Sequence, residues 1–257
     1  MGSTNNPENT FTKLVNGLKL TEKVYLIGGG AYGYSASGDC NMYLVDCDGS
    51  LALIDTGGGK GIPKVIDNIR RMGFDPKTIE IAFITHCHYD HIGGNKAIVG
   101  ATGCKIAAHE AEKEDIESLG ELTLYQMGLE EGLSFEPSEV DIALKGGEKI
   151  RVGGVEFEIV HTPGHTPGGV SLVIREEGVT SLFPGDTASA QGKLGFINAP
   201  GFSLPEWKKS IKEMLDLEPD RMFPGHGVFV LSGAVEHLTV YDEKMNAPWV
   251  NVVTMVG

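Results

Sequence analysis

The stretch of sequence that decides the fold reads Thr85-His86-Cys87-His88-Tyr89-Asp90-His91 and directly follows a short apolar segment, residues 79–84. Four of its side chains, within six residues, can bind a metal ion. On a helix, residues i and i+2 point about 200° apart, so His86 and His88 could share a metal only from a turn at a strand end. The sequence therefore predicts a metal site built on a loop.

Three further ligand candidates, each beside a glycine, stand at predicted strand ends. They are His165, Asp186 and His226. Glycine lets the backbone approach a ligand closely, as a site assembled from several loops requires. Five imidazoles and two carboxylates exceed the needs of one tetrahedral zinc ion but suit two ions that share a carboxylate. We therefore expect two divalent metal ions, with zinc favoured by the donors and Mn²⁺ or Fe²⁺ chemically acceptable.

Outward from this motif, apolar runs and glycine-containing turns predict alternating strands and helices. Strands are predicted at residues 24–27, 41–46, 51–55, 79–84 and 105–108, then at 141–144, 149–152, 155–160, 170–174 and 180–183. Helices are predicted at 62–72, near 95–99, at 205–215 and at 232–244, with a helical excursion at about 109–135. Two strand-rich halves, each closing with helices, indicate an α+β fold, a four-layer αββα sandwich, as a single domain over residues 1–257.

Composition and charge narrow the classes of partner. The formal charge of −14, from 35 acidic and 21 basic residues, disfavours nucleic acid and anionic membrane surfaces. No apolar run approaches the length of a membrane span, and the N-terminal residues lack the pattern of a secretory signal. The four cysteines show no metal or disulfide spacing, which predicts reduced thiols in a cytoplasmic protein. We expect a small-molecule substrate, and a homodimer stays open.

Several segments appear in the order of a known family. They are Leu53-Ile54-Asp55-Thr56-Gly57, an HxHxDH motif at 86–91, His165, Asp186 and Pro224-Gly225-His226-Gly227. On these segments, which span most of the chain, the sequence resembles the metallo-β-lactamase superfamily. The resemblance implies the αββα sandwich with two mixed β-sheets, and a metal-dependent hydrolase.

The resemblance also implies a ligand assignment. It places His86, His88 and His165 on a first metal and Asp90, His91 and His226 on a second, with Asp186 bridging. Two dications that share a water lower its pKa from 15.7 to about 7, which leaves a metal-bridging hydroxide as nucleophile. Asp90 is the expected catalytic residue, which orients this nucleophile and passes a proton to the leaving group.

Other residues receive supporting roles. Asp55 is expected to accept hydrogen bonds that hold a ligand or loop, and Cys87 to pack away from the metals. Substrate contacts are expected from Tyr32 and Tyr34 in a glycine-rich loop, from Tyr89, and from Phe196 and Ile197 after the bridging aspartate. For each of these residues, simple packing is an equally good or better explanation. His109, His161 and His237 are expected to be structural.

Within the superfamily, His88 in place of glutamate argues against the oxygen-reducing di-iron branch. We expect hydrolysis of a lactone, ester, thioester or phosphodiester. The C-terminal part offers few basic residues for glutathione, and Ser189 stands where acyl-homoserine lactonases place a tyrosine. The alternatives are a mononuclear-iron persulfide dioxygenase-like oxidoreductase and a β-lactamase-like activity.

Overall fold

The computed structural model describes residues 17–193 and 198–247, and in them the strands form two sheets. The first sheet has the order β1-β2-β3-β4-β5-β6-β7 and the second β12-β11-β10-β9-β8. The strands of the first sheet are β1 Leu18–Lys19, β2 Val24–Gly28, β3 Met42–Asp46, β4 Leu51–Ile54, β5 Ile79–Phe83, β6 Lys105–His109 and β7 Ile142–Leu144. Those of the second are β8 Lys149–Val152, β9 Val155–His161, β10 Val170–Glu176, β11 Val179–Phe183 and β12 Arg221–Met222.

Both sheets are mixed. Strands β1 to β4 run antiparallel and β4 to β7 parallel, whereas in the second sheet only the β11–β12 pair is parallel. Because β9, β11 and β12 point the same way, their carboxyl ends meet at one edge. The β4 and β5 ends meet in the same manner in the first sheet. Loops that follow these strands can therefore come together in space.

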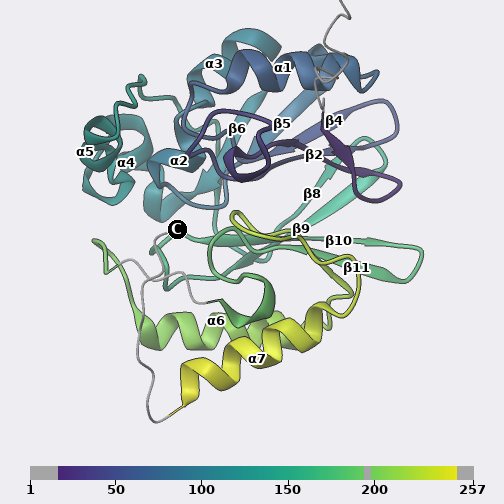
Figure 1. Ribbon diagram of the computed structural model, residues 1–257, viewed down its shortest axis with the longest axis vertical. Coiled ribbons are helices and arrows are strands. Elements are labelled where there is room, and N and C mark those ends of the chain that lie inside the picture. The colour runs from purple at the N-terminus through teal and green to yellow at the C-terminus, as the bar shows by residue number, and fades with distance from the viewer. Residues whose placement is uncertain (1–16, 194–197, 248–257) are drawn as a thin grey trace, which may run out of the picture.

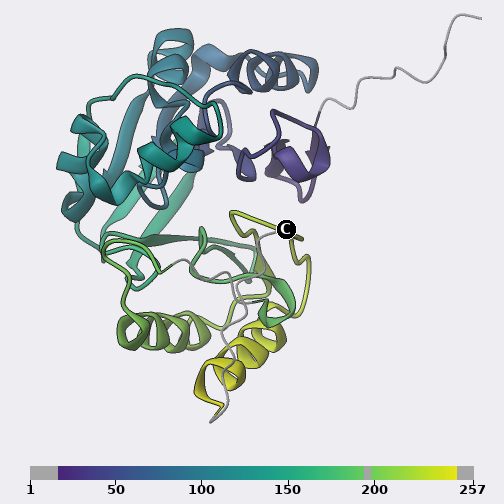
Figure 2. The ribbon, with the colours of Figure 1, turned by 60° about the vertical axis from the view of Figure 1, so that its left-hand side comes forward.

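Helices cover the outer face of each sheet. The helices are α1 Ile62–Arg71, α2 Tyr89–Ile92, α3 Asn95–Thr102, α4 Lys113–Ser118, α5 Tyr125–Glu130, α6 Leu204–Asp216 and α7 Ala234–Asn246. Figure 1 shows α1 and α3 outside the first sheet and α6 and α7 outside the second, and the turned view in Figure 2 keeps this order. The expected four-layer αββα sandwich is confirmed.

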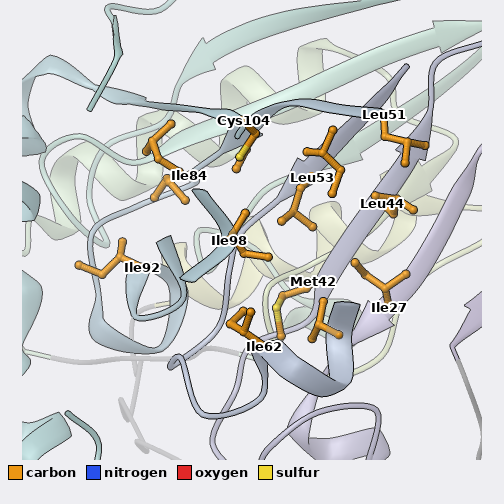
Figure 3. Packing of buried hydrophobic residues seen from close by; sticks show 14 of the residues in the cluster. Ile27, Met42, Leu44, Leu51, Leu53, Ile62, Ile84, Ile92, Ile98 and Cys104 are labelled. Atoms are coloured by element: carbon orange, nitrogen blue, oxygen red, sulfur yellow. The ribbon is translucent and has the colours of Figure 1, made fainter. Parts of the chain in front are cut away.

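Three apolar clusters correspond to the three spaces between the layers. The first lies between the first sheet and its helices, where Figure 3 shows Ile62 and Ile98 beside Met42 and Leu53. The second fills the space between the sheets, with Phe83 and Phe157 in ring contact at 4.9 Å between centroids. The third joins the second sheet to α6 and α7. Alternating side chains of the strands thus bury both faces of each sheet.

One predicted strand belongs to a different sheet from the one its place in the sequence indicates. Residues 141–144 follow the helical excursion and lie next to the strands of the second half in the sequence, but β7 pairs parallel with β6 in the first sheet. Asp141 makes this connection, because its backbone N–H donates to Ile106 O and its Oδ2 accepts from Ile106 N. The sequence does not predict the short strands β1 and β12 or the single-turn helix α2. Segments of two to four residues are too short to show a hydrophobic periodicity.

Candidate metal centre

The HxHxDH motif lies where β5 ends. Residues 86–88 are in an extended turn, and helix α2 begins at Tyr89, so the two histidines face the same point while Asp90 and His91 follow on one helical turn. Thr85 fixes the start of this turn, because its N–H and its hydroxyl both donate to the carboxylate of Asp55 at 2.8 Å. The motif therefore lies on a loop at a strand end, where the sequence predicts it.

The second sheet supplies the remaining candidates from one edge. His165 lies in the turn between β9 and β10, Asp186 follows β11, and His226 follows β12. The backbone there must come very close to the ligands. A side chain at Gly225 would place its Cβ 2.3 Å from Asp186 Oδ1 and 2.7 Å from His91 Cε1, so only glycine fits.

The first group of donors comprises three buried histidines. His86 Nε2 and His165 Nε2 each lie 3.1 Å from His88 Nδ1. Two nitrogens bound to a tetrahedral zinc ion at about 2.0–2.1 Å lie roughly 3.3 Å apart, so these three nitrogens have nearly the required spacing. Burial lowers the pKa of all three imidazoles, to about 3 for His88, which keeps them neutral and able to donate a lone pair.

The second group joins His91 and His226 to the carboxylate of Asp90, with Asp186 beside them. His226 Nε2 lies 3.0 Å from Asp90 Oδ2 and 3.3 Å from His91 Nε2. Burial by itself disfavours charge on His91 and His226, but neighbouring acidic groups outweigh it and raise the pKa of both imidazoles. The same pairs lower the pKa of Asp90 and Asp186 against the effect of burial. The carboxylates therefore stay ionised and offer anionic oxygen donors.

Asp186 lies between the two groups. Its Oδ1 is 3.4 Å from His91 Nε2 and has no hydrogen-bond partner among the described residues, while its Oδ2 is 3.5 Å from His226 Nε2 and 3.8 Å from His165 Nε2. A buried carboxylate oxygen without a partner is costly unless an ion satisfies it. Clusters of ligand atoms within 4.8 Å of one another include His86, His88, His165; His86, His91, Asp186; and Asp90, His91, His226. These donors fit two divalent ions.

The supporting residues lie largely where the sequence indicates. Asp55 Oδ2 lies 2.9 Å from His91 Nδ1, which confirms its role as a hydrogen-bond acceptor and directs the other nitrogen of His91 into the site. Cys87 is fully buried, and its thiol donates to Leu122 O at 3.3 Å, as expected for packing away from the metals. His109 and His161 stack on each other at 4.1 Å, and His237 accepts a hydrogen bond from Gln191 N.

The candidate substrate contacts differ in exposure. Tyr32 is 38% exposed and its hydroxyl donates to Gly227 O, next to His226, whereas Tyr34 is buried and stacks on Tyr32 at 6.2 Å. Tyr89 is half-buried, and its ring would contact a Cβ at Gly128 of α5 at 3.1 Å. Phe196 and Ile197 lie outside the described residues. Among these candidates, Tyr32 presents the most surface beside the metal ligands.

Two other features bear on the site. All four cysteines, Cys40, Cys47, Cys87 and Cys104, are buried and have no disulfide partner in the structure. No helix in the described part of the chain is both long and apolar enough to cross a bilayer.

The sequence does not predict three residues that contact the loops of the site, namely Asn41, Tyr43 and Glu112. A lone polar residue inside or beside an apolar run carries no sequence signal.

Comparison with known proteins agrees with this geometry. The family model described as "Metallo-beta-lactamase superfamily" matches residues 37–226. The chain is 31% identical over 192 residues to the "Beta-lactamase-like protein 2 homolog" of Drosophila melanogaster, covering 73% of this chain and 58% of that protein. It thus spans less than two thirds of the length of the fly relative.

Bacterial relatives are covered more completely. The chain is 27% identical over 211 residues to the "Probable metallo-hydrolase YqgX" of Bacillus subtilis (strain 168), covering 82% of this chain and 92% of that protein. It is 28% identical over 215 residues to the "Hydroxyacylglutathione hydrolase GloC" of Haemophilus influenzae, covering 83% and 92%.

Among solved structures, the fold is similar to that of BJP-1, a subclass B3 metallo-beta-lactamase of Bradyrhizobium japonicum. The TM-score is 0.69 with 21% identity, over 88% of this chain and 89% of that chain. The family match and its clustered histidine and aspartate ligands lead to one conclusion: the chain belongs to the metallo-β-lactamase superfamily and has the fold and candidate metal sites of its metallo-hydrolases.

Proposed function

We propose that this chain is a dinuclear hydrolase, zinc-dependent, that cleaves a small-molecule lactone, ester or thioester. The observation that carries the proposal is the position of Asp186, whose two oxygens face the three-histidine group and the group of Asp90, His91 and His226. A carboxylate shared between two complete donor sets is what a pair of divalent ions requires.

Two ions bound there supply Lewis acidity, which lowers the pKa of water to about 7 and polarises the bond to be cleaved. The residues of this chain supply the geometry. His86, His88 and His165 are neutral donors held by burial, and Asp55 fixes the orientation of His91 through Nδ1. Asp90 keeps its charge because His91 and His226 lower its pKa, so Asp90 can accept a proton and hand it to the leaving group.

The surface beside His226 supports an uncharged acyl substrate. Tyr32 is 38% exposed and Val228 62% exposed, and Phe229 lies 6.1 Å from Tyr32 between ring centroids. These apolar side chains suit the acyl or ring carbons of a lactone, ester or thioester. The formal charge of −14 disfavours anionic phosphodiesters, which remain the second class within the same chemistry.

The test combines metal analysis of the purified chain with turnover of lactones, thioesters, bis-p-nitrophenyl phosphate and a cephalosporin. We expect about two zinc equivalents and hydrolysis of the lactone or thioester. Asp90→Asn is expected to lower kcat by about 10²–10⁴-fold at equal metal content. Asp75→Asn, an exposed aspartate that accepts a hydrogen bond from Lys77 N before β5, is the control and should leave kcat unchanged.

Three results would contradict the proposal. One iron equivalent with oxygen uptake on a glutathione persulfide, and no hydrolysis, would place the chain with the oxidoreductases. Cleavage of bis-p-nitrophenyl phosphate alone would show that the apolar surface does not select the substrate. Full turnover by Asp90→Asn with both metals bound would remove the proton-transfer role of Asp90.

A further inference from the structure

His226 is the most exposed of the ligand candidates. Its side chain is 47% exposed, compared with 17% for Asp90 and Asp186 and 0% for His91. Packing therefore holds this imidazole less firmly than it holds the other ligand candidates. The backbone of the segment that carries it, residues 224–227, must instead be held by other groups.

Asn41 holds this backbone on both sides of His226. Its side-chain Nδ2 donates to Pro224 O at 3.0 Å and to Gly227 O at 3.1 Å, and its backbone N–H donates to Gly225 O at 2.7 Å. The side chain is only 3% exposed, so water competes little for these carbonyls. Three donors from one residue thus fix the peptides before and after the ligand.

Neighbouring residues on the same loop and strand support these contacts. The Tyr43 hydroxyl donates to Pro224 O at 2.8 Å, and the Tyr32 hydroxyl donates to Gly227 O at 2.9 Å. The backbone N–H of Cys40 donates to Asp90 O at 3.4 Å. Residues just before β3 and within it therefore hold the backbone of Asp90 and the backbone on both sides of His226, two members of the second donor group.

We propose that Asn41 is a positioning residue that sets the geometry of the second metal site by holding the backbone on both sides of His226. This inference rests on the proposed dinuclear function. An amide NH₂ has two donors at a fixed angle and can bind two carbonyls at once, whereas a carboxylate in its place would repel both carbonyl oxygens. The three-histidine site receives none of these hydrogen bonds, so the effect of Asn41 falls on the second metal.

The test uses Asn41→Asp, with Asn68→Asp as matched control. Asn68 is also 3% exposed and its Nδ2 also donates to two backbone carbonyls, Ile27 O at 2.8 Å and Tyr34 O at 2.9 Å, but it does not contact residues 224–227. Zinc affinity of each site is measured by titration of the metal-free chain against a competing chelator, well below the melting temperature of each variant. Cobalt spectra report the ligand geometry independently.

For Asn41→Asp, we expect the affinity for the second zinc equivalent to fall at least about tenfold, with the first unchanged. Asn68→Asp should lower the melting temperature and leave the ratio of the two affinities as in the parent chain. Tyr43→Phe, which removes one hydroxyl from Pro224 O and keeps the ring, should weaken only the second site and decides the matter if Asn41→Asp does not fold.

Each failure has a separate signature. A parent chain that binds a single equivalent contradicts the dinuclear function. A parent chain with two equivalents, and variants with the same two affinities, contradict only the role of Asn41. An equal loss at both sites would show that Asn41 stabilises the fold as a whole rather than the second site.

Discussion

Asp55 connects the end of β4 to the motif that follows β5. It accepts hydrogen bonds from Thr85 N, from Thr85 Oγ1 and from the imidazole Nδ1 of His91. The parallel pairing of β4 with β5 brings these groups together, because the two strands end side by side. A single carboxylate therefore fixes both the turn that begins the motif and the ring orientation of one ligand.

Asp55→Asn is predicted to weaken zinc binding about 10–100-fold, because an amide cannot accept all three hydrogen bonds and orients His91 less well. Zinc titration of the purified variant measures the change. Asp75→Asn serves as control. Unchanged zinc affinity in Asp55→Asn would mean that packing alone orients His91.

Glu112 is a buried carboxyl behind the metal loops. Its Oε1 accepts from Gly168 N at 2.8 Å, near the loop of His165. Burial raises the pKa of Glu112 above its ordinary value of 4.5, although the hydrogen bond from Gly168 N acts in the opposite direction. The folded state therefore binds this proton more tightly than the unfolded state does.

Glu112→Gln is predicted to gain stability relative to the parent chain as pH rises from about 4.5 through the raised pKa. In this window the unfolded parent releases the proton while the folded parent still keeps it, so the free energy of unfolding of the parent falls by up to about 1.4 kcal/mol for each pH unit that the window spans. Denaturant unfolding of both chains across pH, at fixed metal load, measures the difference.

Glu117→Gln is the contrasting control for that series. The hydrogen bond from Lys113 lowers the pKa of Glu117, so its carboxylate stabilises the fold above the ordinary 4.5 and loses this effect as pH falls through the lowered value. The difference in free energy of unfolding between Glu117→Gln and the parent should therefore have the opposite sign to that between Glu112→Gln and the parent. The same sign in both series would contradict the burial argument for Glu112.

At the scale of elements, α6 holds the loops of two ligands from the second sheet. Ser210 Oγ donates to Pro163 O at 2.7 Å, and Ser203 N donates to Gly164 O at 2.9 Å, in the loop of His165. Trp207 Nε1 donates to Thr187 O at 2.5 Å, next to Asp186. The helix therefore sets the spacing between the first donor group and the carboxylate of Asp186.

Gly164→Ala is predicted to destabilise the chain by more than about 2 kcal/mol. Gly164 has a φ of +130°, and a Cβ there would lie 2.3 Å from Trp207 N, so both the backbone and the contact with α6 are disturbed. Denaturant unfolding measures the loss. Gly73→Ala, at a φ of +93° with no atom within 4 Å of the added Cβ, isolates the backbone strain and should cost about 1 kcal/mol. Equal losses would show that the contact with α6 does not matter.

At the scale of the whole molecule, the metal centre joins the two halves. His86, His88, Asp90 and His91 follow a strand of the first sheet, whereas His165, Asp186 and His226 follow strands of the second. Each donor group contains members from both halves. A metal ion bound by these donors would therefore stabilise the packing of one sheet against the other, in addition to the apolar cluster between them.

Removal of metal by a chelator is predicted to lower the melting temperature by about 5–11 °C for each site, if zinc is present at about 100 times its Kd. This follows from about 2.7 kcal/mol of linked stabilisation and about 2–4 °C per kcal/mol for a chain of this size. Differential scanning calorimetry with and without chelator measures the shift. His165→Ala should show a smaller shift than the parent, and a parent chain insensitive to chelator would contradict the bridging arrangement.

Local patterns in the sequence were sufficient for most of the fold and for the ligand candidates. Alternating and continuous apolar runs predict β2 to β6 and β8 to β11 within a few residues, because side-chain periodicity reflects burial directly. The metal-binding motif at 86–91 can also be recognised from the sequence. Imidazoles and carboxylates are chemically distinctive, and their spacing together with the strand before them already indicates a loop site.

Tertiary structure alone decided which segments meet. The local sequence of residues 141–144 does not indicate that β7 pairs with β6, because a short strand fits the edge of either sheet. The hydrogen bonds between Asp141 and Ile106 decide which sheet it joins. Likewise, Asn41 acquires its role only when the fold brings it to Pro224 and Gly227. The physical reason is that periodicity records how one segment is buried, whereas strand partners and loop hydrogen bonds depend on residues far away in the chain.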